Sequence, residues 1–252
     1  MRAAIRQLKI RQMLESNEFV DLETLCRELG ASESSARRDL VALEAGGLLR
    51  RVYGGAMTVQ PSSDHLLDFA WQSTRMSEEK ARIAAAAAHL LEDGQTVILD
   101  GGSTAAAVAR ELSSRSLQVM TNSLAIADLF ADARQIELTL TGGFLYPRLR
   151  IMVGPICEQM LQDVRADVLI MGIGGVAEAG FSNNNTLVVG PERIMMKVSR
   201  KIIIVADHSK FGRSAMIPVA PLEAAHVVVS DTALAEEHRQ MLEKHGVEAI
   251  LA

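Results

Sequence analysis

The sequence predicts an α/β protein of two parts, a small N-terminal winged helix-turn-helix domain and a larger domain with a mostly parallel sheet. The chain has 252 residues, more than one domain usually contains. Apolar residues at helical spacing fill the first part, whereas short apolar runs alternate with helical segments from Thr96 onward. A polar stretch that includes Pro61 separates the two patterns. We therefore expect a first domain over 1–57, a linker over 58–76 and a second domain over 77–252.

The first domain is expected to begin with two helices. An amphipathic first helix is predicted by apolar residues at roughly helical spacing, namely Ile5, Leu8, Ile10, Met13 and Leu14. Phe19 and Val20 then form a short extended step. Leu22, Leu25 and Leu29 predict a second, short helix. Gly30 ends that helix, because glycine adopts a positive φ at little steric cost.

A third helix is predicted to start after Ser32, whose hydroxyl offers an N-cap oxygen. Ala36, Leu40 and Leu43 form its buried stripe. At 100° per residue, small hydroxyls and guanidinium groups near its N-terminus then face outward or flank the outward face. A helix, a glycine-containing turn and a second helix are the parts of a helix-turn-helix.

The segment 48–55 predicts a short β-hairpin that carries two arginines. In a DNA-binding domain the N-terminal residues of the recognition helix reach base edges, and a basic wing contacts the phosphate backbone. The alternative is a three-helix interaction module whose arginines are only solvated. The expected DNA-binding residues are Ser32, Ser34, Ser35, Arg37, Arg38, Arg50 and Arg51.

The charge distribution is compatible with DNA binding although the net charge is −5. Residues 1–56 carry nine basic and eight acidic residues, whereas residues 57–252 carry seventeen basic and twenty-three acidic residues. The excess of acidic residues therefore belongs to the larger part of the chain. No apolar run reaches the ~20 residues of a membrane span, and the N-terminus lacks the apolar region of a signal peptide. We therefore expect a cytoplasmic protein with no membrane partner.

Composition excludes other classes of protein. The chain is 48% hydrophobic and 23% charged, too apolar for a mainly disordered protein. Its two cysteines, Cys26 and Cys157, lie far apart in the sequence, and its six histidines have no metal-type spacing. We expect no disulfide, no metal site and no cofactor.

In the second domain, glycines and small polar residues follow five of the predicted strands. The predicted strands are 96–99, 117–120, 136–140, 168–171, 202–205 and 227–229. Ligands bind outside the carboxyl ends of strands in open α/β sheets, so we expect one convergent effector site. The expected effector-binding residues are Asp100, Gly101, Gly102, Ser103, Thr104, Asn122, Ser123, Gly142, Gly143, Arg150, Gly172, Gly174, Asp207 and Lys210.

The loop after the first of these strands is the best candidate for an anion site. Gly101 and Gly102 let backbone N–H groups approach a ligand, and the helix that follows directs its N-terminal donors toward it. Lys210 is the preferred charge partner of a phosphate at this site. The alternatives are that each glycine is an ordinary turn residue and that Arg150 is a solvated loop charge.

Several segments resemble the signatures of the DeoR family of bacterial transcriptional regulators, in the same order along the chain. They are Ala31–Leu40 with its Arg-Arg-Asp-Leu core, Val52–Ala56, Asp100–Thr104, Thr121–Leu124, Thr141–Gly143, Arg165–Asp167 and Ala206–Gly212. The resemblance implies a second domain similar to ribose-5-phosphate isomerase and CoA transferases, a sugar-phosphate effector and repression of a carbohydrate-metabolism operon. Departures from the family pattern are Ser35 in place of Thr, Ala36 in place of Ile, and the segment 187–193, where many members carry Glu-Ala and a Lys.

The sequence therefore predicts a homo-oligomeric regulator, a dimer or tetramer, and not an enzyme. Its recognition helices would lie about 34–36 Å apart, or a multiple of that, on an operator in double-stranded DNA. The alternative is a sugar-phosphate isomerase-like enzyme with an accessory N-terminal domain, for which Asp100 or Asp207 would have to act as the base. The identity of the sugar and the operator sequence do not follow from the sequence.

Overall fold

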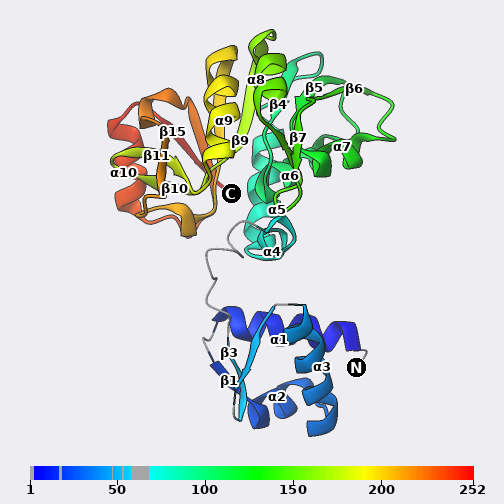
Figure 1. Cartoon of the computed structure of the whole chain (residues 1–252). Coiled ribbons are helices and arrows are strands. Elements are labelled where there is room, and N and C mark those ends of the chain that lie inside the picture. The colour runs from blue at the N-terminus through cyan, green and yellow to red at the C-terminus, as the bar shows by residue number, and fades with distance from the viewer. Residues whose placement is uncertain (1–2, 17–18, 47, 53, 58–67) are drawn as a thin grey trace. The chain divides into compact units, whose positions relative to one another are not determined.

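The computed structural model describes residues 3–16, 19–46, 48–52, 54–57 and 68–252. The chain divides into two compact units, Met1–Leu66 and Leu67–Ala252, and each is described by itself. Figure 1 labels most of the helices and strands of both units. Within the described ranges, no helix is long and apolar enough to cross a membrane.

The first unit is a helix-turn-helix with a small antiparallel sheet, which confirms the predicted winged helix-turn-helix. Its elements are α1 (Ala3–Ser16), β1 (Phe19–Asp21), α2 (Leu22–Leu29), α3 (Glu33–Ala45), β2 (Arg50–Val52) and β3 (Gly55–Met57). The sheet has the order β1-β3-β2, so the step at Phe19 pairs with the hairpin. Gly30 ends α2 with φ +56°, as its position predicts. The tip of the hairpin at residue 53 lies outside the described residues.

The core of the first unit uses only part of the apolar face predicted for α1. Ile10 and Leu14 are fully buried, whereas Ile5 and Leu8 are each 54% exposed. At 100° per residue, Ile5 and Leu8 lie on the side of the helix opposite Ile10. The prediction was therefore wrong for these two residues, because a loose apolar spacing was assigned to one face.

Ser32 precedes α3 as predicted, but its side chain does not cap the helix. Its hydroxyl lies 3.1 Å from the hydroxyl of Ser34 and 3.0 Å from that of Ser35. The expected N-cap hydrogen bond is absent because the Ser32 hydroxyl interacts with its neighbours in α3 instead.

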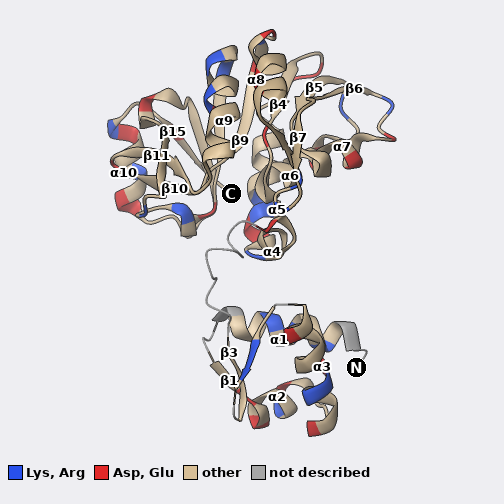
Figure 2. Cartoon of the chain, in the orientation of Figure 1, with Lys and Arg blue, Asp and Glu red and all other residues tan. Residues whose placement is uncertain are grey.

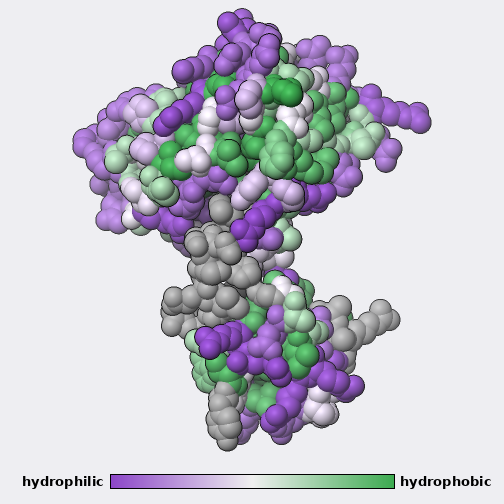
Figure 3. All heavy atoms as spheres, in the orientation of Figure 1, coloured by the Kyte–Doolittle hydropathy of each residue, from purple (hydrophilic) through white to green (hydrophobic). Residues whose placement is uncertain are grey.

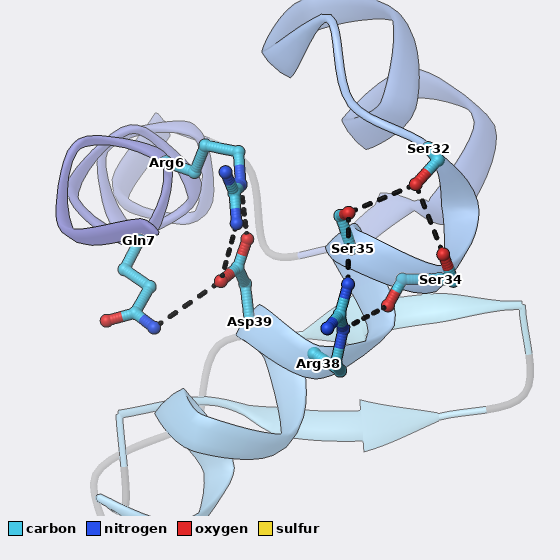
Figure 4. A network of polar contacts seen from close by, with 7 residues as sticks. All are labelled: Arg6, Gln7, Ser32, Ser34, Ser35, Arg38 and Asp39. Atoms are coloured by element: carbon cyan, nitrogen blue, oxygen red, sulfur yellow. Dashed lines mark hydrogen bonds and ion pairs between the residues drawn. The ribbon is translucent and has the colours of Figure 1, made fainter. Parts of the chain in front are cut away.

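A salt bridge joins α1 to α3 inside the first unit (Figure 4). The Nε of Arg6 donates to Asp39 at 2.6 Å, and a second guanidinium nitrogen donates to the other carboxylate oxygen at 3.2 Å. Asp39 is only 4% exposed. The Asp of the Arg-Arg-Asp-Leu motif therefore points into the domain and fixes the direction of α3, while the two arginines before it are exposed.

We expect Asp39→Ala to destabilise the first unit by about 2 kcal/mol, because it leaves the partly buried guanidinium of Arg6 without its carboxylate. Hydrogen exchange of the α1 and α3 amides in the full chain would measure the loss. Asp39→Asn keeps hydrogen-bond acceptance and should cost less. Equal protection in Asp39→Ala and the unsubstituted protein would contradict this role for the salt bridge.

The second unit is a three-layer α/β structure built on one parallel sheet, and the predicted α/β class is confirmed. Its helices are α4 (Phe69–Thr74), α5 (Ser77–Ala88), α6 (Ser103–Leu112), α7 (Leu124–Phe130), α8 (Pro155–Gln162), α9 (Thr186–Val198) and α10 (Glu236–Lys244), with short 3-10 turns η2 (His208–Lys210) and η3 (Leu222–Ala224). Its strands are β4 (Thr96–Leu99), β5 (Leu117–Thr121), β6 (Ile136–Leu140), β7 (Phe144–Tyr146), β8 (Ile151–Val153), β9 (Ala166–Gly172), β10 (Gly175–Ala177), β11 (Gly180–Asn183), β12 (Ser199–Val205), β13 (Ile217–Ala220), β14 (Val227–Ser230) and β15 (Glu248–Leu251).

The central sheet has seven strands in the order β15-β14-β12-β9-β4-β5-β6, and every neighbouring pair is parallel. All six strands predicted from the sequence belong to it. Three features were not predicted from the sequence: β15 at the edge of the sheet, the β7-β8 hairpin and the small antiparallel sheet β10-β11-β13. The missed strands are three or four residues long, too short to show a clear period.

Side chains that alternate along the strands form two apolar cores, one on each face of the sheet. Val97 and Leu99 of β4 join the core that includes residues of α5, α6 and α7. Ile98, between them, joins the core that includes residues of α8, α9 and α10. The alanine-rich stretch of α5 packs against α6, and its residues Ala84, Ala87 and Ala88 are buried there.

Part of the predicted linker is structured. Asp68 caps α4 by accepting from the amide of Trp71 at 3.0 Å, and Phe69 is buried in the core of the second unit. The described residues from Asp68 onward therefore belong to the second unit rather than to a connecting segment. The polar composition of 58–76 concealed this short helix, because only its first residue is buried.

Candidate functional site

The outward face of α3 carries the residues predicted to contact DNA. Ser34, Arg38 and Val41 are exposed, as the helical geometry predicts, and Ser35 is partly buried beside them. Arg38 donates from Nε to the carbonyl of Ser34 at 3.3 Å and lies 3.5 Å from the hydroxyl of Ser35 (Figure 4). The hydroxyls and the guanidinium thus form one continuous polar surface at the N-terminal half of α3.

The four arginines of this surface differ in their partners. Arg37 pairs with Glu33 one turn earlier, and Arg51 of β2 pairs with Glu44 of α3. The Arg51 side chain, with its backbone amide, holds the pKa of Glu44 below its usual value. Within the described residues, neither Arg38 nor Arg50 has a carboxylate partner. Figure 2 shows the basic residues of α3 and of the hairpin, and the two unpaired guanidinium groups are the ones ready to bind an anion.

In the second unit, the strand order changes direction between β4 and β9. The chain runs from β4 through β5 to β6 on one side, and from β9 through β12 and β14 to β15 on the other. Ligands bind at such a switch point, outside the carboxyl ends of the strands. Asp100 follows β4, its amide donates to Ile170 of β9 at 3.0 Å, and its side chain is 1% exposed. The first predicted loop therefore lies at the switch point.

The backbone of this loop is held close to its neighbours. The amide of Gly101 donates to the side-chain oxygen of Asn122 at 3.1 Å. A Cβ at Gly101 would lie 2.3 Å from a methyl carbon of Ile151, so a larger residue does not fit there. Gly102 precedes α6 with φ +130°, and there is open space where its side chain would be. Ser103 and Thr104 start α6, whose first-turn N–H groups have no intrahelical acceptor and suit an anion.

A cluster of cations lies at the end of β12. Asp207 is 1% exposed and accepts from the backbone and hydroxyl of Ser209. Burial lowers the pKa of Lys210, and Arg213 and Arg75 lower it further, while Asp207 opposes them. The Lys210 ammonium makes no hydrogen bond with any described residue. The cluster has more cations than carboxylates, which favours an anionic ligand.

Lys80 of α5 belongs to the same cluster and was missed by the sequence analysis. It is 6% exposed, and its ammonium donates to the carbonyl of Gln72 at 2.6 Å. Burial lowers its pKa to about 8. The negative charge of Asp207 raises this pKa, and the positive charge of Lys210 lowers it further. Because it follows two glutamates at the start of a helix, its sequence context is that of a solvated helix face. Only the packing of the unit shows that it is buried.

A second buried carboxyl group lies near Asp100. Glu192 of α9 is 1% exposed, and the side-chain amide of Asn183 donates to one of its oxygens at 2.7 Å. Burial, together with the carboxyl of Asp100, raises the pKa of Glu192 well above its usual value. Glu192 lies in the segment 187–193 that departs from the family pattern, and this segment is helical. No sequence signal distinguished it from a surface glutamate.

The structure gives several predicted effector residues other surroundings. Ser123 is buried and caps α7 through its hydroxyl, and Asn122 bridges the loop to Met152. Gly142 and Gly143 follow β6, two strands from β4, and pack against Ile156, Val153 and Cys157. The side chain of Arg150 is exposed, and its carbonyl accepts from Leu124. These residues shape the loops around the switch point, and a direct effector contact from them stays a prediction.

The end of β9 combines an open and a crowded glycine. Gly172 has open space where a side chain would be, whereas a Cβ at Gly174 would lie 2.9 Å from the side-chain oxygen of Asn183. Gly172 therefore leaves room for a ligand beside Asp100, whereas Gly174 packs against β11. No group of His, Cys, Asp and Glu that could hold a metal ion occurs among the residues for which side chains are described.

These two units define a class of protein, a transcription regulator that joins a DNA-reading winged helix-turn-helix to an α/β sensor domain. Two family profiles match the chain, "DeoR-like helix-turn-helix domain" over residues 6–62 and "DeoR C terminal sensor domain" over residues 75–232. The chain belongs to the DeoR family, and its predicted class, a DNA-binding transcriptional regulator, is confirmed.

Curated relatives match almost the whole chain. The HTH-type transcriptional repressor GlcR of Bacillus subtilis is 30% identical over 98% of this chain and 95% of its own. The transcriptional repressor AccR of Agrobacterium fabrum is 33% identical over 90% of this chain and 89% of its own. The glycerol-3-phosphate regulon repressor of Escherichia coli is 29% identical over 98% of both.

Solved structures resemble the chain more distantly. The ribose 5-phosphate isomerase A of Methanocaldococcus jannaschii has a TM-score of 0.41 and 20% identity, over 54% of each chain. The eIF2B beta subunit of Chaetomium thermophilum has a TM-score of 0.46 and 13% identity, over 96% of this chain and 85% of its own.

Proposed function

We propose that this protein is a repressor of a carbohydrate-metabolism operon whose affinity for its operator is changed by a phosphorylated sugar. The observation that carries the proposal is the cluster of two lysines, the buried Lys80 and the half-buried Lys210, beside a parallel-sheet switch point. A phosphate supplies the negative charge that this cluster lacks. The names of the relatives, among them a glycerol-3-phosphate regulon repressor, support the same class of ligand.

The distance between the carboxyl ends of β12 and β4 suits the length of a sugar phosphate. β12, which leads to Lys210, and β4, which leads to Asp100, are separated by one strand and therefore lie about 10 Å apart. This span accommodates a phosphate at one end and hydroxyl groups at the other. The protein would have one state that binds DNA and one that does not. An effector that binds these two states with unequal affinity would change operator affinity by about 5 to 150-fold.

The test has two steps. A thermal-shift screen of the full chain with pentose, hexose and glycerol phosphates identifies the effector, because a ligand that binds only the folded state raises its melting temperature. Operator binding is then measured with and without that compound, on a duplex selected by the protein from random sequences. Binding of the compound with no change in operator affinity would contradict the proposal.

We expect Lys210→Ala to weaken binding of the sugar phosphate about tenfold or more while operator affinity without effector stays unchanged. The reason is the loss of a cation whose ammonium makes no hydrogen bond with any described residue and can therefore bind a phosphate. Titration calorimetry measures the first quantity and fluorescence anisotropy the second. Lys197→Ala, which removes an exposed lysine from α9, is the matched control and should change neither. A Lys210→Ala protein that binds sugar phosphate normally would exclude Lys210 from the site.

We also propose that the protein does not catalyse a reaction. Its relatives are named as regulators, and Asp207, one of the two candidate bases, is already engaged by Ser209. Incubation of the pure protein with pentose and hexose phosphates tests this point. Isomerisation at ordinary enzyme rates would support the alternative, an isomerase-like enzyme with an accessory domain.

We propose further that the protein is a homo-oligomer through its second unit. Large apolar side chains are exposed there, among them Phe144, Ile156, Leu187 and Met216. In the view of Figure 3, apolar residues gather over the middle of this unit with hydrophilic residues around them. Exposed apolar patches with a polar rim mark protein interfaces. A monomer in analytical ultracentrifugation at micromolar concentration would contradict this proposal.

A further inference from the structure

Two buried carboxyl groups at the switch point lack the partners that buried carboxyl groups normally have. Asp100 and Glu192 are each 1% exposed. One oxygen of each, Oδ1 of Asp100 and Oε2 of Glu192, has no hydrogen-bond partner among the described residues. Buried polar atoms are nearly always satisfied, so two unsatisfied carboxyl oxygens in one site point to a group that is missing.

The groups around the pair do not neutralise it. Arg193 is the nearest cation to Glu192, but its guanidinium is exposed and donates to the carbonyls of Val219 and Pro218. The other titratable neighbours are Cys157, whose pKa is raised by burial, and Glu158, which packs against Gly190 of α9. Burial raises the pKa of Asp100 to about 7. The pair therefore keeps at least one proton near neutral pH.

The pair lies where a ligand has room. Asp100 adjoins Gly102, and its amide is bonded to β9, which ends at Gly172. Both glycines have open space at the position of a side chain. Glu192 is oriented by the amide of Asn183, which occupies its other oxygen and leaves Oε2 available.

We propose that Asp100 and Glu192 together bind two hydroxyl groups of the effector through their unsatisfied oxygens. A carboxyl pair that holds a proton both donates and accepts hydrogen bonds, and so does a hydroxyl group. This inference rests on the proposed function and assigns Glu192, outside the family pattern, as a determinant of effector specificity.

The experiment uses titration calorimetry of the full chain with the sugar phosphate that the thermal-shift screen selects and with inorganic phosphate as the second probe. Glu192→Leu should weaken binding of the sugar phosphate at least about tenfold and change binding of inorganic phosphate less than about twofold. Glu192→Gln keeps one donor and one acceptor and should bind the sugar phosphate within about threefold of the unsubstituted protein. The melting temperature of the unliganded Leu variant is measured as well, because the substitution removes an unsatisfied carboxyl oxygen and also the acceptor of the Asn183 amide.

The outcomes separate this inference from the proposed function. Absence of any melting shift with sugar phosphates would overturn the proposed function and this inference with it. A sugar phosphate that binds the unsubstituted protein and Glu192→Leu equally would overturn this inference alone. Glucosamine 6-phosphate that binds more tightly than glucose 6-phosphate, with the preference lost in Glu192→Gln, would also overturn it and identify an ammonium site.

Discussion

Arg38→Ala should lower the affinity of the protein for its operator by about 5 to 150-fold, because a guanidinium that reads a guanine or grips a phosphate contributes about 1–3 kcal/mol. Arg38 is exposed on the outward face of α3 and has no carboxylate partner among the described residues. Its hydrogen bonds to Ser34 and Ser35 hold the side chain without neutralising it. Fluorescence anisotropy at a fixed salt concentration measures the change.

Arg37→Ala is the matched control for this substitution. Arg37 lies next to Arg38, but Glu33 already pairs with it, so its guanidinium would have to leave that salt bridge before it could bind DNA. The affinity for sugar phosphate should stay the same in both variants, because the substituted residues belong to the other unit. If Arg38→Ala and Lys210→Ala produced one common phenotype, the assignment of DNA reading and effector sensing to separate units would be wrong.

The DNA-binding unit was predictable from sequence because its signals are local. Gly30 fixes a turn, and the period of Ala36, Leu40 and Leu43 fixes which side of α3 faces the core. The inward direction of Asp39 was not predictable, because its partner Arg6 lies thirty-three residues earlier, on another helix. The same loose periodicity that identified α1 placed Ile5 and Leu8 on the wrong face.

The proposed effector site was predictable only in part, because it is assembled from distant segments. The glycines after the predicted strands indicated that a site lies at the carboxyl ends of the sheet. The order of the parallel strands places Asp100 at the switch point. Lys80 and Glu192 enter the same region from helices that lie far from those strand ends in sequence. Each has the sequence context of an exposed helix residue, and only tertiary packing buries it. Helical charged residues are exposed so often that their type and spacing do not indicate burial.

The burial of Asp100 should make the second unit less stable at pH 8 than at pH 5. A carboxyl whose folded-state pKa is raised binds more protons in the folded than in the unfolded state. Its stabilising contribution is complete below the unfolded value of 3.8 and is lost as the pH rises to the folded value of about 7. Between these limits one such carboxyl lowers the free energy of unfolding by about 1.4 kcal/mol per pH unit.

Urea denaturation between pH 5 and pH 8, followed by the fluorescence of Trp71, measures this effect. Trp71 is the only tryptophan and lies in α4 of the second unit, so it reports on that unit. The range stops at pH 8 because Lys80, with a pKa lowered to about 8, makes the free energy of unfolding rise with pH above that value.

Asp100→Asn, which cannot ionise, should reduce the loss of stability between pH 5 and pH 8 and be more stable than the unsubstituted protein at pH 8. The exposed carboxylate variant Asp163→Asn should retain the fall. If Asp100→Asn and Asp163→Asn gave the same pH dependence, Asp100 would ionise in the folded protein as it does in water. Asp100 would then be a carboxylate at neutral pH and could only accept hydrogen bonds from the hydroxyl groups of the proposed effector.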